Sequence, residues 1–147
     1  MEIMLAEKIW QRALVYSIRT DVGVKELGID PDTEFDSYDT FDTLYVLALD
    51  GHFPAGACRI RFTDENTAKI ERVNVVREYR GNGTGRLLVQ FAEKYSASCG
   101  HRNILITSRE EAVGFYEKLG YTAHADEAFR STVYRVIPMK KELLAEV

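Results

Sequence analysis

Long apolar runs are missing from this 147-residue chain, and none approaches the roughly 20 residues that a membrane-spanning helix needs. The first ten residues carry Glu2, Glu7 and Lys8, where a secretory signal would have a basic start followed by an apolar stretch. We therefore expect no contact with a membrane and place the protein in the cytoplasm.

Cysteine and histidine are also scarce. Cys58 and Cys99 lie far apart in the sequence and form no CxxC pair, so we expect reduced thiols. His52, His101 and His124 are scattered and show no spacing typical of a metal site. The sequence therefore predicts no metal. Cys58 lies in a predicted strand and Cys99 at the end of a predicted helix, which disfavours a covalent route through a thiolate.

The chain also lacks an excess of positively charged residues. The chain has 19 Lys and Arg against 23 Asp and Glu, a formal net charge of -4, and no cluster of basic residues. Binding to phosphate backbones needs such clusters, so we expect no nucleic-acid partner. Hydrophobic residues make up 46% of the sequence, which is enough to fill one core. We expect a single domain spanning residues 1–147.

Hydrophobic periodicity predicts an α/β chain. We expect strands at residues 2–6, 43–49, 55–62, 67–76, 103–107, 121–125 and 131–140, and helices at residues 7–19, 20–27, 83–98 and 108–119. Ile9, Ala13 and Tyr16 are expected on the buried face of the first helix, and Ser108 and Glu111 as the capping box of the last. Residues 29–42 are irregular and acidic, and residues 141–147 are expected to form a helical turn. A strand, helix and strand in succession require at least one parallel pairing, so the sheet is mixed.

Three alternating glycines open the third helix, in the segment Arg80-Gly81-Asn82-Gly83-Thr84-Gly85. Each glycine costs about 1 kcal/mol relative to alanine inside a helix, so helix propensity does not explain them. They are typical of a backbone that must approach a ligand, and free N–H groups at a helix start bind anions. Arg80 and Arg86 add positive charge suited to a phosphate.

This loop matches neither a P-loop, which needs GxxxxGK[ST], nor a dinucleotide fingerprint, because Arg86 stands where the last glycine would be. It does fit [RQ]xxGx[GA], with Arg80, Gly83 and Gly85. The segment resembles the acyl-CoA loop of the GNAT superfamily of N-acetyltransferases, small bacterial type. Taken alone, the pattern leaves open a glycine-rich helix start that binds nothing.

A second motif lies at the distance that the family has. Residues 112–121, AVGFYEKLGY, resemble the family signature A-x-x-F-Y-x-K-x-G-[FY]. The order of elements also agrees, so the resemblance covers most of the chain. It implies the GNAT fold, a mixed and mostly antiparallel sheet of about six to seven strands flanked by four helices.

The resemblance implies acetyl-CoA as cosubstrate. In the family, the loop amides bind the CoA pyrophosphate, the strand near 73–76 binds the pantetheine arm, and a strand amide polarises the thioester carbonyl, here near Val75. The residues implied for the cofactor are Val73, Val75, Val76, Arg80, Gly81, Asn82, Gly83, Thr84, Gly85 and Arg86. Tyr116 is implied as the group that donates a proton or hydrogen bond to the departing thiolate. From the residues alone, a core tyrosine with its hydroxyl satisfied is the preferred interpretation.

The proton acceptor for the amine is left open. Glu71 is the carboxylate on the strand expected at residues 67–76. Its side chain is expected to point to the same face of that strand as Val73 and Val75. Some family members carry their glutamate two positions earlier, where this chain has Lys69. Two roles are therefore equally open for Glu71: the proton acceptor, or a partner in an ion pair. In the acidic stretch, Glu34 and Asp36 are the candidates for attracting a cationic amine.

The sequence as a whole predicts an acyl-CoA-dependent N-acetyltransferase that acts on a primary amine of a small molecule by direct attack in a ternary complex. A non-catalytic CoA-binding or protein-interaction module of the same fold is the alternative. A toxin that acetylates charged tRNA is disfavoured because the chain lacks a basic surface. The acceptor, the length of the acyl group and the oligomeric state stay open, although paired final strands often form homodimers in the family.

Overall fold

A computed structural model of the chain describes residues 1–144. The elements follow the predicted order. The strands are β1 (Glu2–Leu5), β2 (Leu44–Asp50), β3 (Phe53–Phe62), β4 (Thr67–Val75), β5 (Asn103–Arg109), β6 (Thr122–Ala123), β7 (Phe129–Arg130) and β8 (Arg135–Glu142), and the α-helices are α1 (Ile9–Arg19), α2 (Pro31–Glu34), α3 (Thr84–Ser98) and α4 (Val113–Lys118). A π-helix, η1 (Thr20–Glu26), follows α1, and three short 3-10 turns are η2 (Arg77–Tyr79), η3 (Glu110–Ala112) and η4 (Ala125–Glu127).

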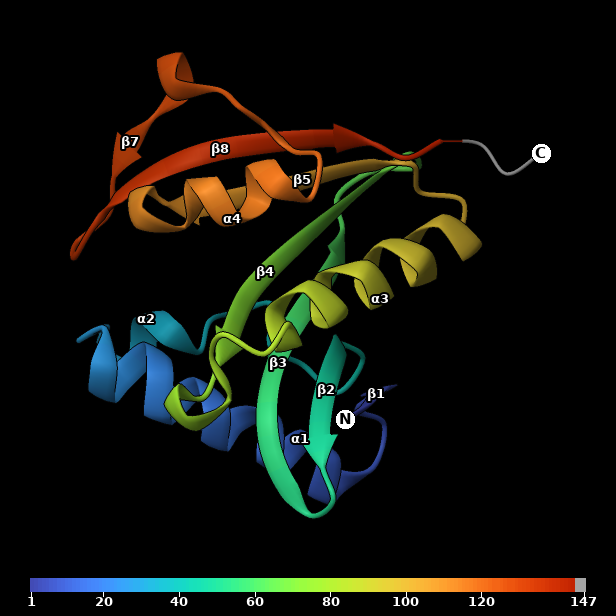
Figure 1. Ribbon diagram of the computed structural model, residues 1–147, viewed down its shortest axis with the longest axis vertical. Helices are drawn as coiled ribbons and strands as arrows, with labels where there is room; N and C mark the ends of the chain where they lie inside the picture. The colour runs from blue at the N-terminus through green and yellow to red at the C-terminus, as the bar shows by residue number, and fades with distance from the viewer. Residues whose placement is uncertain (145–147) are drawn as a thin grey trace.

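The eight strands form one sheet in the order β1-β2-β3-β4-β5-β8-β6, with β7 beside β8. All pairs are antiparallel except β4 and β5, which are parallel. The predicted mixed, mostly antiparallel sheet is confirmed, with one strand more than the six to seven expected. Strands β4 and β5 pair only from Thr67↔Asn103 to Lys69↔Leu105 and then diverge, as Figure 1 shows.

The sheet is covered on both faces by side chains that alternate along the strands. On β2, Tyr45, Leu47 and Leu49 pack with Val15 and Ile18 of α1. Their neighbours in the strand turn to the opposite face, where they pack with α3 and with Tyr116 of α4. The two resulting cores hold the diverging strands between them.

A β-bulge interrupts the pairing of β3 and β4. Ala57 pairs with Asn74 and Arg59 pairs with Glu71, so two β4 residues, Arg72 and Val73, lie opposite the single residue Cys58. An extra residue moves every later side chain to the other face of the strand. The expectation that Glu71 points to the same face of the strand as Val73 and Val75 is therefore wrong: the two valines pack on the α3 core, whereas Glu71 contacts Arg59 and Arg61.

Two local expectations are also wrong. Ile9 is 88% exposed, because the buried stripe of α1 and η1 follows Val15, Ile18 and Val22 instead. Ser108 caps no helix: β5 continues to Arg109, and a 3-10 turn separates it from α4. The helix expected at 20–27 is present at Thr20–Glu26, as the π-helix η1.

The acidic stretch and the C-terminal end of the chain also differ from expectation. A short helix, α2, lies inside the stretch expected to be irregular. Strand β8 continues to Glu142, so the helical turn expected at 141–147 does not begin there, and its residues 145–147 lie outside the described residues.

Candidate functional site

A cavity of about 840 Å³ occupies the place where β4 and β5 diverge. It is lined from both faces of the sheet. Leu27, Thr33 and Glu34 border it on the side of α1 and α2, and Phe115 and Tyr116 border it on the side of α4. A ligand lying between the two strands could therefore be reached from both faces.

The glycine loop forms one wall of this cavity. Gly81 and Gly83 have φ values of +81° and +82°, a conformation that side chains with a Cβ rarely adopt. A Cβ on Gly85 would lie 3.1 Å from the ring of Phe115, so this glycine lets α3 pack closely against α4. Helix α3 begins directly after Gly83, and its first N–H groups have no partner within the helix. Such a wall suits an anion.

Most of the predicted cofactor residues line the cavity, and two do not. Val73, Val75, Arg80, Gly81, Gly83, Thr84, Gly85 and Arg86 lie in its wall. Val76 and Asn82 lie outside it, and the Val76 N–H donates to the Ala55 carbonyl at 2.9 Å. The guanidinium of Arg80 contacts both carboxylate oxygens of Glu26 and donates through Nε to the Val75 carbonyl.

The free edge of β4 faces the cavity. Asn74 pairs with Ala57, and Val76 donates to Ala55, so both neighbours of Val75 are turned toward β3. Hydrogen-bonding groups alternate along an antiparallel strand, so the Val75 N–H and C=O point the other way, toward the diverged β5. This is the edge along which an extended ligand could add as a further strand.

Tyr116 lies in the wall opposite this edge, with only 6% of its surface exposed. In the described part of the chain its hydroxyl has no hydrogen-bond partner, unlike that of Tyr121, which donates to Glu93 at 2.7 Å. Burial raises the pKa of Tyr116, as does the nearby Cys58 thiol, while Arg109 acts in the opposite direction. The hydroxyl therefore keeps its proton at neutral pH and can donate it.

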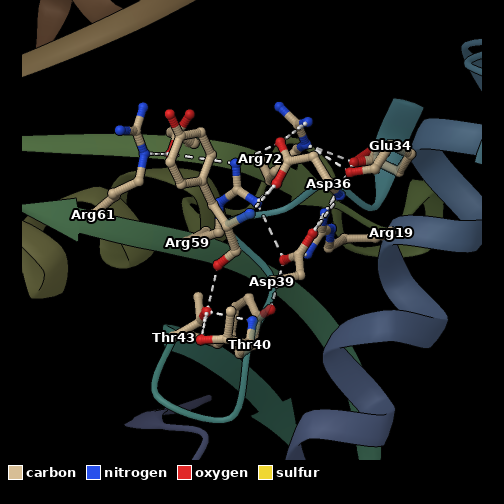
Figure 2. Close-up of polar contacts among 12 residues, drawn as sticks. Arg19, Glu34, Asp36, Asp39, Thr40, Thr43, Arg59, Arg61 and Arg72 are labelled. Carbon is tan, nitrogen blue, oxygen red and sulfur yellow. Dashed lines mark hydrogen bonds and ion pairs between the residues drawn. The ribbon is translucent and has the colours of Figure 1, made fainter. Parts of the chain in front are cut away.

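A cluster of opposite charges borders the other side of the cavity (Figure 2). We call it the charged cluster, and it comprises Arg19, Glu34, Asp36, Asp39, Arg59, Arg61, Glu71 and Arg72. Four arginines balance four carboxylates. Of the six acids in the stretch 29–42, three belong to this cluster, and the other three, Asp30, Asp32 and Asp42, are exposed to solvent.

Glu71 and Glu34 both line the cavity but are held by arginines. Glu71 accepts from Arg61 at 3.0 Å and contacts Arg59 at 3.3 Å. Burial alone would raise the pKa of Glu71, but these cations and Lys69 lower it, so the group is anionic at neutral pH. Glu34 contacts Arg72 at 2.7 Å, yet burial raises its pKa. Asp36 does not line the cavity; it contacts Arg59 and Arg72, which lower its pKa against the effect of burial.

Sequence reasoning missed several residues of the wall. Arg72 and Arg109 lie in it, as do Phe129 and the segment 131–134 between β7 and β8. The segment 131–134 carries no motif, and it reaches the cavity only because β8 pairs with β5.

No group of three or more His, Cys, Asp or Glu side chains within residues 1–144 is arranged to hold a metal ion. None of the helices in the same part of the chain is long and apolar enough to cross a bilayer.

Comparisons with known proteins agree with this geometry. The family described as Acetyltransferase (GNAT) domain matches residues 30–143. A candidate acetyltransferase of Bacillus subtilis is 32% identical over 129 residues, covering 86% of this chain and 87% of that protein. The crystal structure of a candidate N-acetyltransferase from Lactobacillus plantarum superposes with a TM-score of 0.90 at 31% identity, covering 97% of this chain and 98% of that chain.

The same fold occurs in an aminoglycoside 6'-N-acetyltransferase complexed with coenzyme A, with a TM-score of 0.80 at 16% identity over 100% of this chain and 99% of that one. Together with the glycine loop and the diverging strands, the family match identifies the chain: it belongs to the GNAT acetyltransferases, enzymes that use acetyl-CoA.

Proposed function

We propose that this protein transfers the acetyl group of acetyl-CoA to a primary amine of a small molecule, by direct attack in a ternary complex. One observation carries the proposal: the glycine loop, the free edge of β4 and the Tyr116 side chain all line one cavity that reaches both faces of the sheet. Donor and acceptor can then meet between the two strands without a covalent enzyme intermediate.

The donor is assigned to the side of α3 and α4. The N–H groups at the start of α3, with Arg86 beside them, would hold the pyrophosphate. The pantetheine arm would lie along Val73 and Val75, where the edge of β4 faces the cavity. The Val75 carbonyl already accepts from Arg80 Nε at 2.9 Å, so the Val75 N–H is the group left for the ligand. The Val75 N–H would then donate to the thioester carbonyl, whose oxygen gains negative charge when the amine attacks.

The acceptor is assigned to the side of α1 and α2, near Glu71 and Glu34. An alkyl ammonium has a pKa near 10 and must lose a proton before it attacks. Because the pKa of Glu71 is lowered, this carboxylate stays anionic and accepts a hydrogen bond from the ammonium, directly or through water, while the proton that the ammonium loses passes to solvent water. Glu34 and Asp36 are balanced by arginines, which favours an acceptor with one amine over a polycation.

Tyr116 is assigned to the departure of the CoA thiolate. The thiolate of CoA departs when the tetrahedral intermediate collapses, and a neutral hydroxyl close to the sulfur can protonate it. The raised pKa of Tyr116 keeps its hydroxyl protonated across the pH range in which amines are reactive, so the hydroxyl is present as a hydrogen-bond donor to the sulfur. The buried Cys58 has its pKa raised to about 12 by burial, so it is no nucleophile at neutral pH.

The test is an assay of free CoA released from acetyl-CoA in the presence of single primary amines: amino acids, amino sugars, aminoglycosides and polyamines. We expect saturable release with at least one amine, and mass spectrometry should find the acetyl group on its nitrogen. Binding of acetyl-CoA without transfer to any of these amines would contradict the proposal and favour a CoA-binding module without turnover.

A further inference from the structure

The bulge in β4 depends on an unusual backbone conformation. Arg72 has a φ of +54°, and it is the one residue other than glycine with a positive φ in the described part of the chain. In a common type of bulge this left-handed position belongs to glycine, because a Cβ crowds the neighbouring carbonyl there. Something must hold Arg72 in this conformation.

The side chain of Arg72 is fixed at four points by the end of α2 and the residues after it (Figure 2). Its Nε contacts a Glu34 carboxylate oxygen at 2.7 Å and donates to the Glu34 carbonyl at 3.2 Å. Its terminal nitrogen donates to the Thr33 carbonyl at 3.4 Å and to Asp36 at 3.1 Å. The guanidinium thus satisfies the last carbonyls of α2, those of Thr33 and Glu34.

Glu34 is itself held in one place. Its side chain is only 1% exposed, and Arg19 contacts it from α1 at 3.4 Å. A Cβ on Gly23 would lie 1.9 Å from a Glu34 carboxylate oxygen, so η1 leaves room for this carboxylate only because residue 23 is glycine. Helices α1 and α2 and the π-helix η1 therefore define where Arg72 can place its guanidinium.

The bulge in turn decides which amides face the cavity. Before it, Glu71 pairs with Arg59; after it, Asn74 pairs with Ala57. If the extra residue were lost, the groups of Val73, Asn74 and Val75 would exchange directions, and the Val75 N–H would point to β3 instead of the cavity.

We propose that Glu34 is a positioning residue that acts through Arg72: the pair clamps the β4 bulge and so aims the Val75 N–H at the thioester carbonyl. This inference rests on the proposed function. It gives Glu34 a role distinct from the attraction of an amine that the sequence suggested. The cavity wall is then shaped from the acceptor side of the sheet, although the amide acts on the donor.

The experiment measures the thioester carbonyl itself. Acetyl-CoA labelled with ¹³C at this carbonyl is bound to the protein, and difference infrared spectroscopy gives its stretching frequency. A hydrogen bond from the Val75 N–H lowers the frequency in the wild-type complex. We expect Arg72→Ala to lose most of this shift, and Glu34→Gln to reduce it, because an uncharged amide holds the guanidinium more weakly.

Arg72→Gly is the decisive variant. Glycine adopts a positive φ at no steric cost, so it keeps the bulge without the clamp and should retain most of the shift. Arg12→Ala is the matched control: the Arg12 side chain also donates to two backbone carbonyls, those of Thr40 and Thr43, but lies away from the cavity. Glu34→Gln, Arg72→Gly and Arg12→Ala should bind CoA within about threefold of wild type, since the loop that holds its phosphates is unchanged. Arg72→Ala should bind CoA more weakly but still saturably, since the groups of Val73 and Val75 that face the pantetheine arm change direction with the bulge.

Three results would overturn the inference: an unchanged shift in Arg72→Ala, a shift lost as fully in Arg72→Gly as in Arg72→Ala, or an unchanged shift in Glu34→Gln. If Arg72→Ala does not fold, the comparison of Glu34→Gln with Arg72→Gly decides. A wild-type protein that does not bind acetyl-CoA would instead overturn the proposed function, and the two failures are thereby distinguished.

Discussion

Tyr116 is the residue on which the proposed chemistry depends most. Replacing it by phenylalanine removes the hydroxyl and leaves the ring, whose centroid lies 4.9 Å from that of Phe115 and 6.0 Å from that of Tyr121. General acid catalysis contributes about 10²-fold or more, so kcat should fall by at least this factor while the Kd of acetyl-CoA stays nearly unchanged. Steady-state rates and calorimetry measure the two quantities.

Tyr121→Phe is the control for this variant. Tyr121 is buried like Tyr116, but its hydroxyl is bonded to Glu93 and it does not line the cavity. It should lose stability of about 1 kcal/mol and keep kcat. Equal turnover in the wild type and in Tyr116→Phe would show that the thiolate leaves without help from this side chain.

The two cysteines should differ in reactivity. Cys58 is buried, with its pKa raised to about 12, whereas Cys99 is exposed. Iodoacetamide at neutral pH should therefore alkylate Cys99 alone in the folded protein and leave transferase activity intact, because no cysteine takes part in the proposed reaction. Peptide mass spectrometry locates the label. Inactivation that parallels alkylation of Cys58 would instead indicate a covalent route.

At the scale of elements, two glycine substitutions can distinguish cofactor binding by the glycine loop from a general effect of backbone strain at the ends of α3. Gly83 has a φ of +82° in the cavity wall, and Gly100 has a φ of +91° at the other end of α3, with open space around it. Alanine at either position carries the same backbone strain, about 1 kcal/mol or more. Only Gly83→Ala should weaken acetyl-CoA binding, by about tenfold, since it alone displaces the amides that face the pyrophosphate.

Calorimetric titration of both variants with acetyl-CoA tests this expectation. A Cβ at residue 83 would lie 3.3 Å from the Arg86 guanidinium, so Arg86 must also shift. Equal affinity of Gly83→Ala and wild type would mean that the loop does not hold the cofactor; equal weakening in Gly100→Ala would mean that the effect is one of strain alone.

The regular elements could be predicted well, because apolar residues mark them locally. The helix expected at residues 83–98 lies at Thr84–Ser98, and the strand expected at 67–76 lies at Thr67–Val75. The bulge could not be predicted, because Arg72 has no local preference for a positive φ. Its conformation depends on Glu34, which lies 38 residues away in the sequence.

The candidate site was predictable only where a motif carried it. The loop residues Gly81, Gly83 and Gly85 and the side chain of Tyr116 all line the cavity as expected. The acidic residues were interpreted one by one as free charges, whereas Glu34, Asp36 and Asp39 pair with arginines from α1, β3 and β4. Long-range ion pairs of this kind leave no pattern in a single sequence.

At the scale of the whole molecule, the charged cluster makes stability depend on pH. Burial acts to raise the pKa values of Asp36, Asp39 and Glu71, but hydrogen bonds from arginines overcome it and lower them from 3.8 and 4.5. A carboxylate with a lowered pKa stabilises the fold above its unfolded pKa, and this stability is lost as the pH falls through the folded value. Glu34, with its raised pKa, acts in the opposite direction.

The lowered pKa values of these three groups predict that the free energy of unfolding falls as the pH is lowered from about 5 to about 2, against the opposite contribution of Glu34. Urea titrations at several pH values measure it, and Asp39→Asn should flatten the dependence. A free energy of unfolding that stays constant over this range would show that the cluster contributes no net stability through its charges.

The central claim is that acetyl-CoA lies between β4 and the glycine loop. Hydrogen–deuterium exchange with saturating acetyl-CoA tests it most directly, because one measurement shows both whether acetyl-CoA binds and which peptides it protects. We predict slower exchange in peptides covering residues 72–87, including the Val75 amide, and unchanged exchange in peptides covering β1. Unchanged exchange over residues 72–87, with or without protection elsewhere, would contradict the account.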